Sequence, residues 1–229
     1  MLHFCLFDIN NNNCFTGFVA TNITANITIP TQLDAVPVMS VFGWIIIHQR
    51  LGFTFNWNLP CDDYKAGFGS IGADFWLGLE IVHLLTNSQP YRLRVEMQQW
   101  STNLWFSAEY WSFQIGDKYW SFQIGDELND KYRLEVSGYS GDAGDSLQYE
   151  GDFHGDGLFG YYECNGRPFT TYDRDNDMSW FGNCASMYDS GWWYNACYFA
   201  CLTCKLGNNG WWSLPYPYVN NSRMMIKPQ

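Results

Sequence analysis

The chain of 229 residues is long enough to bury a sizeable core, and we expect one large domain. Its net charge of -11, from 12 basic and 23 acidic residues, repels phosphate backbones and anionic lipid heads and so excludes nucleic acid and membranes as expected partners. No apolar run approaches the roughly 20 residues that span a bilayer, and the start of the chain is a poor secretory signal, so we expect a soluble protein whose signal lies outside this sequence.

The first forty residues are rich in Asn, Thr and Ile, and the alternation from Ile23 to Ile29 predicts one or two short strands. The composition then changes, because Phe42–Ile47 is an apolar, β-branched run typical of a buried strand. We therefore divide the chain into a divergent N-terminal segment, residues 1–40, and a main domain, residues 41–229.

Three later segments have clear periodicity. Asp74–Leu85 carries apolar residues at helical spacing between Gly72 and Asn87, which predicts a helix. Tyr91–Met97 and Tyr132–Val136 each alternate apolar with charged residues. This alternation predicts half-exposed antiparallel strands.

A tandem duplication separates these two strands, since Tyr110–Lys118 is repeated almost letter for letter as Tyr119–Glu127. The unit is too short for a solenoid, whose periods are about 20 to 50 residues. We expect it to extend a hairpin or insert a loop, unless it is an artefact of sequence assembly. Beyond Gly138 the sequence is dense in Gly, Asp, Asn, Ser and Tyr, which predicts a loop-rich second half where binding residues commonly lie.

The acidic stretch Asp173–Asp177 alternates three aspartates with other residues. Carboxylates spaced in this way can turn several hard oxygens toward one point, which suits calcium. An EF-hand also needs glycine at its sixth position and glutamate at its twelfth, where this sequence has Met178 and Cys184. From the spacing alone, a calcium site and a solvated acidic turn are equally good interpretations.

Cysteines occur at positions 5, 14, 61, 164, 184, 197, 201 and 204, and an even number in an acidic globular protein indicates an oxidising compartment. Their spacing alone does not give the pairing. Cys201 and Cys204 form a C-x-x-C pair that suits half a zinc site or a redox motif, but nothing completes a zinc site, so we expect structural or adventitious cysteines. Sequons at Asn22, Asn26 and Asn220 predict glycosylation and agree with secretion.

Aromatic residues make up 19% of the sequence, and 12 of them are tryptophans, so we expect rings both in the core and on a binding surface. A bridge between Cys184 and Cys197 would close a loop of roughly 13 residues and stabilise the fold by roughly 3 kcal/mol. It would also hold the acidic loop, Asp173–Asp177, against the aromatic side chains of the segment from Tyr188 to Tyr194. These rings could equally belong to the core.

Ten blocks occur in order along the sequence: Phe42–Trp44, Tyr64–Gly69, Phe75–Glu80, Leu85–Asn87, Tyr91–Val95, Gly138–Leu147, Asp173–Asp177, Gly182–Ala185, Gly191–Cys197 and Arg223–Pro228. In order and rough spacing they resemble the fibrinogen C-terminal (fibrinogen-related) domains of ficolins, tenascins, angiopoietins and fibrinogen. The resemblance implies an α+β fold with a small N-terminal β subdomain and a central twisted antiparallel sheet flanked by short helices. It also implies a loop-rich C-terminal subdomain that binds calcium and ligand.

The resemblance implies that calcium is the cofactor, with Asp175 and Asp177 as side-chain ligands and two backbone carbonyls completing the site. Four residues separate Asp177 from Gly182 where the family pattern usually has three. Counting from the aspartates therefore gives Ser179 as a carbonyl ligand, and counting back from Cys184 gives Gly182.

The resemblance further implies a disulfide between Cys184 and Cys197, a cis peptide before Cys197, and an acetyl-group pocket beside the bridge. In such a pocket the acetyl methyl packs against rings and its carbonyl accepts a backbone N–H. The predicted ligand-binding residues are Cys184, Tyr188, Trp193, Cys197 and Tyr198. Tyr198 stands where the family commonly has a histidine, and the stretch after Cys197 looks about a dozen residues shorter than is typical.

We therefore expect a secreted, calcium-dependent recognition module that binds acetylated glycans or acetyl groups in innate defence or adhesion. The alternative is a protein–protein module that binds a receptor or matrix partner, and the missing histidine and shortened wall favour it somewhat. Four scattered histidines and the lack of a nucleophile elbow argue against an enzyme. Because the sequence has neither Gly-X-Y repeats nor heptads, we expect oligomers to form through a segment not seen here, with a spare cysteine or the domain itself as the alternatives.

Overall fold

The computed structural model describes residues 6–7, 14–15, 23–27, 36–52, 54–116, 131–148 and 162–229. Cys5, Asn22 and the second copy of the duplication lie outside the described residues. Residues 110–115 of the first copy are part of a long strand, β9 (Trp105–Ile115). None of the described helices is long and apolar enough to cross a membrane.

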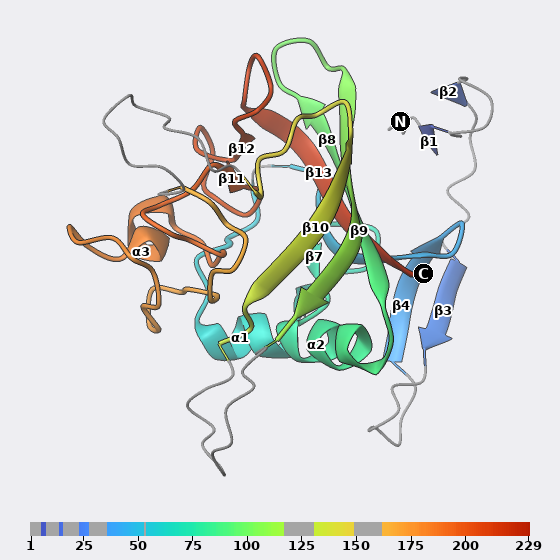
Figure 1. Ribbon diagram of the computed structural model, residues 1–229, viewed down its shortest axis with the longest axis horizontal. Coiled ribbons are helices and arrows are strands. Elements are labelled where there is room, and N and C mark those ends of the chain that lie inside the picture. Colours follow the sequence, from blue (N-terminus) through green and yellow to red (C-terminus); the bar gives the residue numbers. More distant parts are fainter. Residues whose placement is uncertain are drawn as a thin grey trace.

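A nine-stranded sheet forms the centre of the domain (Figure 1). Besides β9, its strands are β3 (Ile23–Ile27), β4 (Val36–Val41), β5 (Trp44–Arg50), β6 (Phe68–Gly69), β7 (Phe75–Trp76), β8 (Tyr91–Gln99), β10 (Leu134–Gly141) and β13 (Val219–Pro228). The main path runs β10-β9-β8-β13-β5-β4-β3, with β7 pairing β5 and β6. All these pairs are antiparallel, and the C-terminal strand β13 lies between β8 and β5.

Two small sheets and three helices complete the described structure. The sheets pair β1 (Leu6–Phe7) with β2 (Cys14–Phe15), and β11 (Ala200–Cys201) with β12 (Gly210–Trp211). The helices are α1 (Cys61–Ala66), α2 (Leu79–Ser88) and α3 (Cys184–Tyr188). Figure 1 shows α1 and α2 below the central sheet and α3 among the C-terminal loops at its side. The predicted α+β architecture with a central antiparallel sheet and short helices is therefore confirmed.

The predicted helix over Asp74–Leu85 begins later and ends later than expected, as α2. Its first residues instead form strand β7, which pairs with β5. Gly78 then has φ 109°, and a Cβ there would lie 2.9 Å from the carbonyl oxygens of Lys65 and Ala66. Only glycine tolerates both that φ and that close approach, so it marks the boundary between β7 and α2.

The two predicted half-exposed strands are confirmed as β8 and β10, although β10 starts at Leu134 because Tyr132 has a left-handed φ of 47°. The predicted buried strand over Phe42–Ile47 is β5, which begins after a turn at Phe42 and Gly43.

Strand β5 is buried on both faces, which explains its unbroken run of isoleucines. Ile45 and Ile47 belong to the main core, which also contains the buried apolar side chains of α2 and β8. Ile46 faces a second, smaller cluster with Met39 of β4 and Met225 of β13. Strand β4 crosses the predicted boundary between residues 40 and 41 and joins the same sheet. The division into an N-terminal segment and a main domain stays a prediction.

Candidate ligand-binding site beside the Cys184–Cys197 bridge

The site lies in the loop-rich second half, as composition predicts. From residue 162 to residue 218 the regular elements are only α3 and the short strands β11 and β12. These loops gather beside the central sheet in Figure 1, drawn in orange to red. The surface they form depends on hydrogen bonds, disulfides and ring contacts instead of a regular ladder.

Helix α3 carries the first half of the bridge. Asn183 precedes it, and its side-chain oxygen accepts the backbone N–H of Ser186 at 2.9 Å, which is the usual N-cap arrangement. Cys184, the first helical residue, forms a disulfide with Cys197, with Cα atoms 5.6 Å apart. The peptide bond between Ala196 and Cys197 is cis. The bridge and the cis peptide implied by the family resemblance are thus both present.

The acidic loop is fastened directly to this helix. One carboxylate oxygen of Asp177 accepts the N–H of Cys184 at 2.8 Å, and the other accepts the N–H of Ser179 at 2.9 Å. Asp175 accepts the N–H of Asp177 at 3.3 Å. The N–H of Met178 donates to the carbonyl of Asn195 at 2.9 Å. The loop is therefore bound to both ends of the segment that the bridge closes.

Two carboxylates lie close together in this loop. Burial raises the pKa of Asp177 above its usual range, the negative charge of Asp175 raises it further, and the N–H donors of Cys184 and Ser179 oppose the rise. The hydroxyl oxygen of Ser179 is buried and has no hydrogen-bond partner within the described residues. A hard cation beside the two carboxylates would relieve their repulsion, so the residues present fit calcium.

The remaining ligands of such a cation would have to be uncharged oxygens, such as backbone carbonyls. Within the described parts of the protein, no three His, Cys, Asp or Glu side chains converge on one point. The loop would accordingly supply two carboxylates and its own carbonyls. Gly182, one of the two predicted carbonyl ligands, has φ 138°, a conformation that favours glycine.

Asp173, the first aspartate of the run, has a structural role. One of its oxygens accepts the hydroxyl of Thr171 at 2.7 Å and the backbone N–H of Cys61 at 3.0 Å, at the start of α1. The neighbouring Arg174 forms an exposed ion pair with Asp62 of the same helix at 2.8 Å. These contacts attach the acidic loop to α1.

A cavity of about 280 Å³ opens beside the bridge. It is lined by Tyr162, Phe181, Tyr188, Ala196, Cys197, Tyr198, Asn208, Trp212 and Tyr218. Three predicted ligand-binding residues, Tyr188, Cys197 and Tyr198, are therefore in its wall. Cys184 is fully buried and reaches the cavity only through its bond to Cys197. None of the described lining residues is charged.

Trp193 was predicted to bind ligand, but the structure places it in the core, and it does not line the cavity. Its side chain is fully buried, its indole N–H donates to the carbonyl of Tyr132 at 2.8 Å, and its ring contacts Phe169 and Trp192 edge to face. The sequence shows a run of aromatic residues here, but without regular secondary structure it gives no rule for which rings point inward.

The rings in the cavity wall are held in place. Tyr188 and Tyr198 meet edge to face with centroids 4.8 Å apart, and the hydroxyl of Tyr198 donates to the carbonyl of Asn208 at 2.7 Å. Burial raises the pKa of Tyr198 well above its ordinary value, so the phenol stays protonated as that donor. Tyr198 thus provides a fixed ring at the position where the family commonly has a histidine.

The family resemblance implies a pocket wall from the stretch after Cys197, but sequence reasoning did not name the residues between 208 and 218 that form it. Trp212 and Tyr218 contact each other edge to face at 5.9 Å. Both belong to the segment that looked shortened, and its density of Trp, Tyr and Pro was the available signal. The shortened segment therefore still forms a pocket wall.

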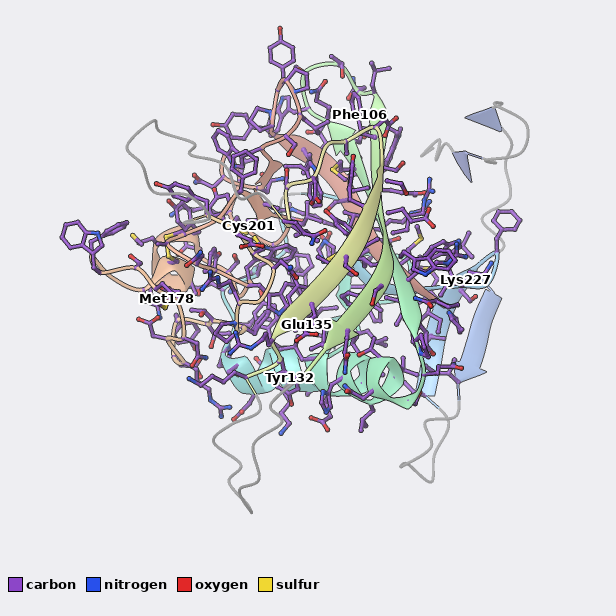
Figure 2. The ribbon with its side chains drawn as sticks, viewed as in Figure 1. Phe106, Tyr132, Glu135, Met178, Cys201 and Lys227 are labelled. Carbon is purple, nitrogen blue, oxygen red and sulfur yellow. A yellow bond between two sulfur atoms is a disulfide. The ribbon has the colours of Figure 1, made fainter. Side chains whose placement is uncertain are left out.

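The acidic loop also has an apolar tip at the edge of the cavity. Trp180 is 85% exposed, Met178 and Phe181 are exposed by more than half, and Phe181 lines the cavity. Figure 2 shows Met178 in the loop beside α3, at the outer side of the domain. Large exposed apolar side chains next to a ring-lined cavity are characteristic of an interaction surface.

The C-x-x-C pair is a disulfide. Cys201 and Cys204 are bonded and fully buried, and the guanidinium of Arg50 donates to the carbonyls of Leu202 and Cys204 at 3.2 and 2.6 Å. The pair is therefore structural in this fold and is no zinc half-site. Cys61 and Cys164 are buried and belong to no disulfide. Cys14 lies in β2.

Two of the three predicted glycosylation sites fall within described strands. Asn26 is in β3, and Asn220 is at an irregularity of β13, where its amide donates to the side-chain oxygen of Asn103 at 3.4 Å. Glycosylation at these positions stays a prediction.

Comparison with known proteins finds relatives that match most of this sequence. Residues 38–214 match the family model of the C-terminal globular domain of fibrinogen beta and gamma chains. Angiopoietin-related protein 1 of Bos taurus is 36% identical over 167 residues, which are 73% of this chain and 29% of the relative. The alpha subunit of human fibrinogen is 41% identical over 167 residues, 71% of this chain and 17% of the relative. The sequence thus spans less than a third of the length of these curated relatives.

Solved structures show the same fold. The fibrinogen-like globe domain of human ANGPTL2 has a TM-score of 0.72 and 30% sequence identity, and the alignment covers 91% of this chain and 94% of that one. Lamprey fibrin D-dimer, solved with the peptide ligand Gly-His-Arg-Pro-amide, also has a TM-score of 0.72 and 30% identity, over 86% of this chain and 66% of that one.

Proposed function

The protein belongs to the family of the C-terminal globular domains of fibrinogen beta and gamma subunits, and we propose that it is a non-catalytic recognition domain that binds a protein ligand outside the cell. The ligand would be a receptor or a matrix component. Likeness to angiopoietin-related proteins supports this function, and so does likeness to a fibrin that was solved with a peptide ligand.

One observation carries the proposal: an uncharged, ring-lined cavity lies beside an exposed apolar tip. Aromatic side chains dominate the central residues of protein interfaces, where their burial supplies much of the binding energy. The cavity presents the rings of Tyr188, Tyr198 and Trp212, and Trp180 and Phe181 project beside it. A protein surface with apolar side chains would cover both at once, whereas a single acetyl group would fill only the cavity.

We further propose that calcium supports this surface. Asp175 and Asp177 would hold the ion with backbone carbonyls of the loop, at Ser179 or Gly182. When bound, calcium neutralises the repulsion between the two carboxylates. Asp177 keeps its hydrogen bonds to Ser179 and Cys184 and so fixes the apolar tip relative to the bridge.

A lectin-like function is the second candidate, because Tyr188 and Cys197, which the family resemblance implies for an acetyl-group pocket, line the cavity. The two functions differ in what competes for the site. A protein interface extends beyond the cavity, so millimolar N-acetylglucosamine or free acetate should leave it largely intact. The same compounds should abolish binding to an acetylated glycan.

The test is a binding screen of the purified domain, with calcium, against arrayed receptor ectodomains and matrix proteins and against an acetylated-glycan array. We expect saturable binding to a protein that Tyr188→Ala weakens by about tenfold or more. Trp111→Ala, which removes an exposed ring on β9, should leave it unchanged. Binding only to acetylated glycans, displaced by N-acetylglucosamine, would establish the lectin function instead.

A further inference from the structure

A second, apolar cavity shares a lining residue with the first. It has a volume of about 360 Å³ and is lined by Trp100, Ser101, Gly207, Tyr216, Pro217 and Tyr218. Tyr218 also lines the cavity beside the bridge, and its ring contacts Trp212 of that cavity edge to face at 5.9 Å. The two cavities are therefore neighbours that share Tyr218, and we call the surface they form together the groove.

The walls of the second cavity come from two segments far apart in sequence. The backbone N–H of Trp100, at the turn between β8 and β9, donates to the carbonyl of Tyr218 at 2.9 Å. The side chain of Gln99 donates to the carbonyl of Tyr216 at the same distance. The two side chains are partly open to solvent, Trp100 at 45% and Tyr216 at 62% of their surface. The turn and the C-terminal loop are thus fixed together, and each contributes a partly exposed ring.

We propose that this groove binds an extended, uncharged peptide segment of the protein ligand, rich in proline and apolar residues, across both cavities. This inference rests on the proposed function and names the part of the ligand that the site would recognise. Two neighbouring ring-lined cavities suit successive side chains of an extended peptide, and aromatic-lined grooves are the usual docking sites of proline-rich segments.

The lack of charged side chains in the groove determines which peptide segments would bind there. None of the described residues that line either cavity carries a charge, although the whole protein has a net charge of -11. A charged ligand group buried there would lose its hydration without gaining an opposite charge. Proline also costs little entropy on binding, because its backbone is already restricted.

The experiment is selection from a displayed library of random linear peptides on the purified domain with calcium. Enriched peptides are then synthesised and titrated against the domain and its variants. We expect uncharged sequences rich in proline and apolar residues. Trp100→Ala, Tyr216→Ala and Tyr198→Ala should each weaken binding by about tenfold or more, and Trp111→Ala should change it less than about twofold. Circular dichroism verifies that each variant is folded.

Three results would overturn the inference: enrichment of charged peptides, no enriched peptide at all, or binders that Trp100→Ala and Tyr216→Ala leave unaffected. Two variants in different segments guard against a folding defect in either one. Binders that depend on Tyr198 but on neither Trp100 nor Tyr216 would confine recognition to the first cavity. That outcome would remove this inference and leave the proposed function standing, because the array of folded proteins tests the latter independently.

Discussion

The carboxylate of Asp177 accepts the backbone N–H of Cys184 at 2.8 Å, so a single side chain joins the acidic loop to the disulfide. The same carboxylate accepts the N–H of Ser179, just before the exposed Trp180. The position of the apolar tip therefore depends on the conformation of the acidic loop and on the presence of the bridge. Mutations in the loop and in the bridge can test this dependence.

Replacing Asp175 should weaken calcium binding. Asp175→Asn removes one negative charge from the proposed site but keeps an oxygen that can accept the N–H of Asp177. We expect calcium affinity to fall by about tenfold or more, since the number of charged ligands sets affinity at such sites. Isothermal titration with calcium measures the change. The matched control is Asp173→Asn, because Asp173 binds Cys61 and Thr171. Equal losses in both variants would contradict the assignment of ligands.

Removal of the bridge should destabilise the domain. The double variant Cys184→Ala, Cys197→Ala opens a loop with a sequence separation of 13, which should lower the free energy of unfolding by about 3 kcal/mol. The variant Cys201→Ala, Cys204→Ala opens a separation of only 3 and should lose about 1 kcal/mol less through loop entropy. Urea denaturation measures both. A larger loss from the short loop would show that the packing of the buried sulfurs matters more than loop closure.

Stability should fall in mild acid because of His48. Burial, and to a smaller extent the charge of Arg50, lowers the pKa of His48 from 6.5 to about 3. Below pH 6.5 the unfolded protein therefore binds a proton that the native state excludes, and native stability decreases. The loss should reach about 2 kcal/mol at pH 5. Urea denaturation between pH 7.5 and 5 tests this, and His48→Gln, which never carries a charge, should lack this component. An unchanged pH dependence in that variant would disprove the assignment.

Replacing Trp193 should lower the stability of the domain, because Trp193 is a core residue and does not line the cavity. Trp193→Ala leaves a large hole in the core and should lower the free energy of unfolding by about 3 to 5 kcal/mol. Trp193→Phe keeps a ring but leaves the buried carbonyl of Tyr132 without its donor, at a cost of about 1 to 3 kcal/mol. Chemical denaturation measures both. A folded Trp193→Phe that has full stability and no ligand binding would place the residue in the site after all.

The sequence predicts the periodic elements well and their boundaries less well. Strand β8 follows from strict alternation, since every second side chain points into the core. The start of α2 was missed because Phe75 and Trp76 fit a helical spacing as well as a strand, and only the pairing with β5 decides between them. That pairing is a contact between segments distant in sequence, which local spacing does not contain.

The sequence likewise predicts some residues of the site and not others. Tyr188, Cys197 and Tyr198 were reachable because sequence blocks around them resemble a known family. Trp193 and the far wall at Trp212 and Tyr218 were not, because they lie in loops that have no periodicity. Their orientation follows from long-range contacts, such as the hydrogen bond from Trp193 to Tyr132. The groove that reaches Trp100 likewise depends on a hydrogen bond between a hairpin turn and the C-terminal loop.

The most direct test of the proposed function is a hydrogen–deuterium exchange footprint of the domain, with and without a protein ligand from the array. We predict slower exchange for amides between residues 178 and 198 and between residues 207 and 218, where the apolar tip and cavity walls lie. Protection confined to the central strands β8 and β9, with these two segments exchanging as in the free domain, would contradict the proposed function.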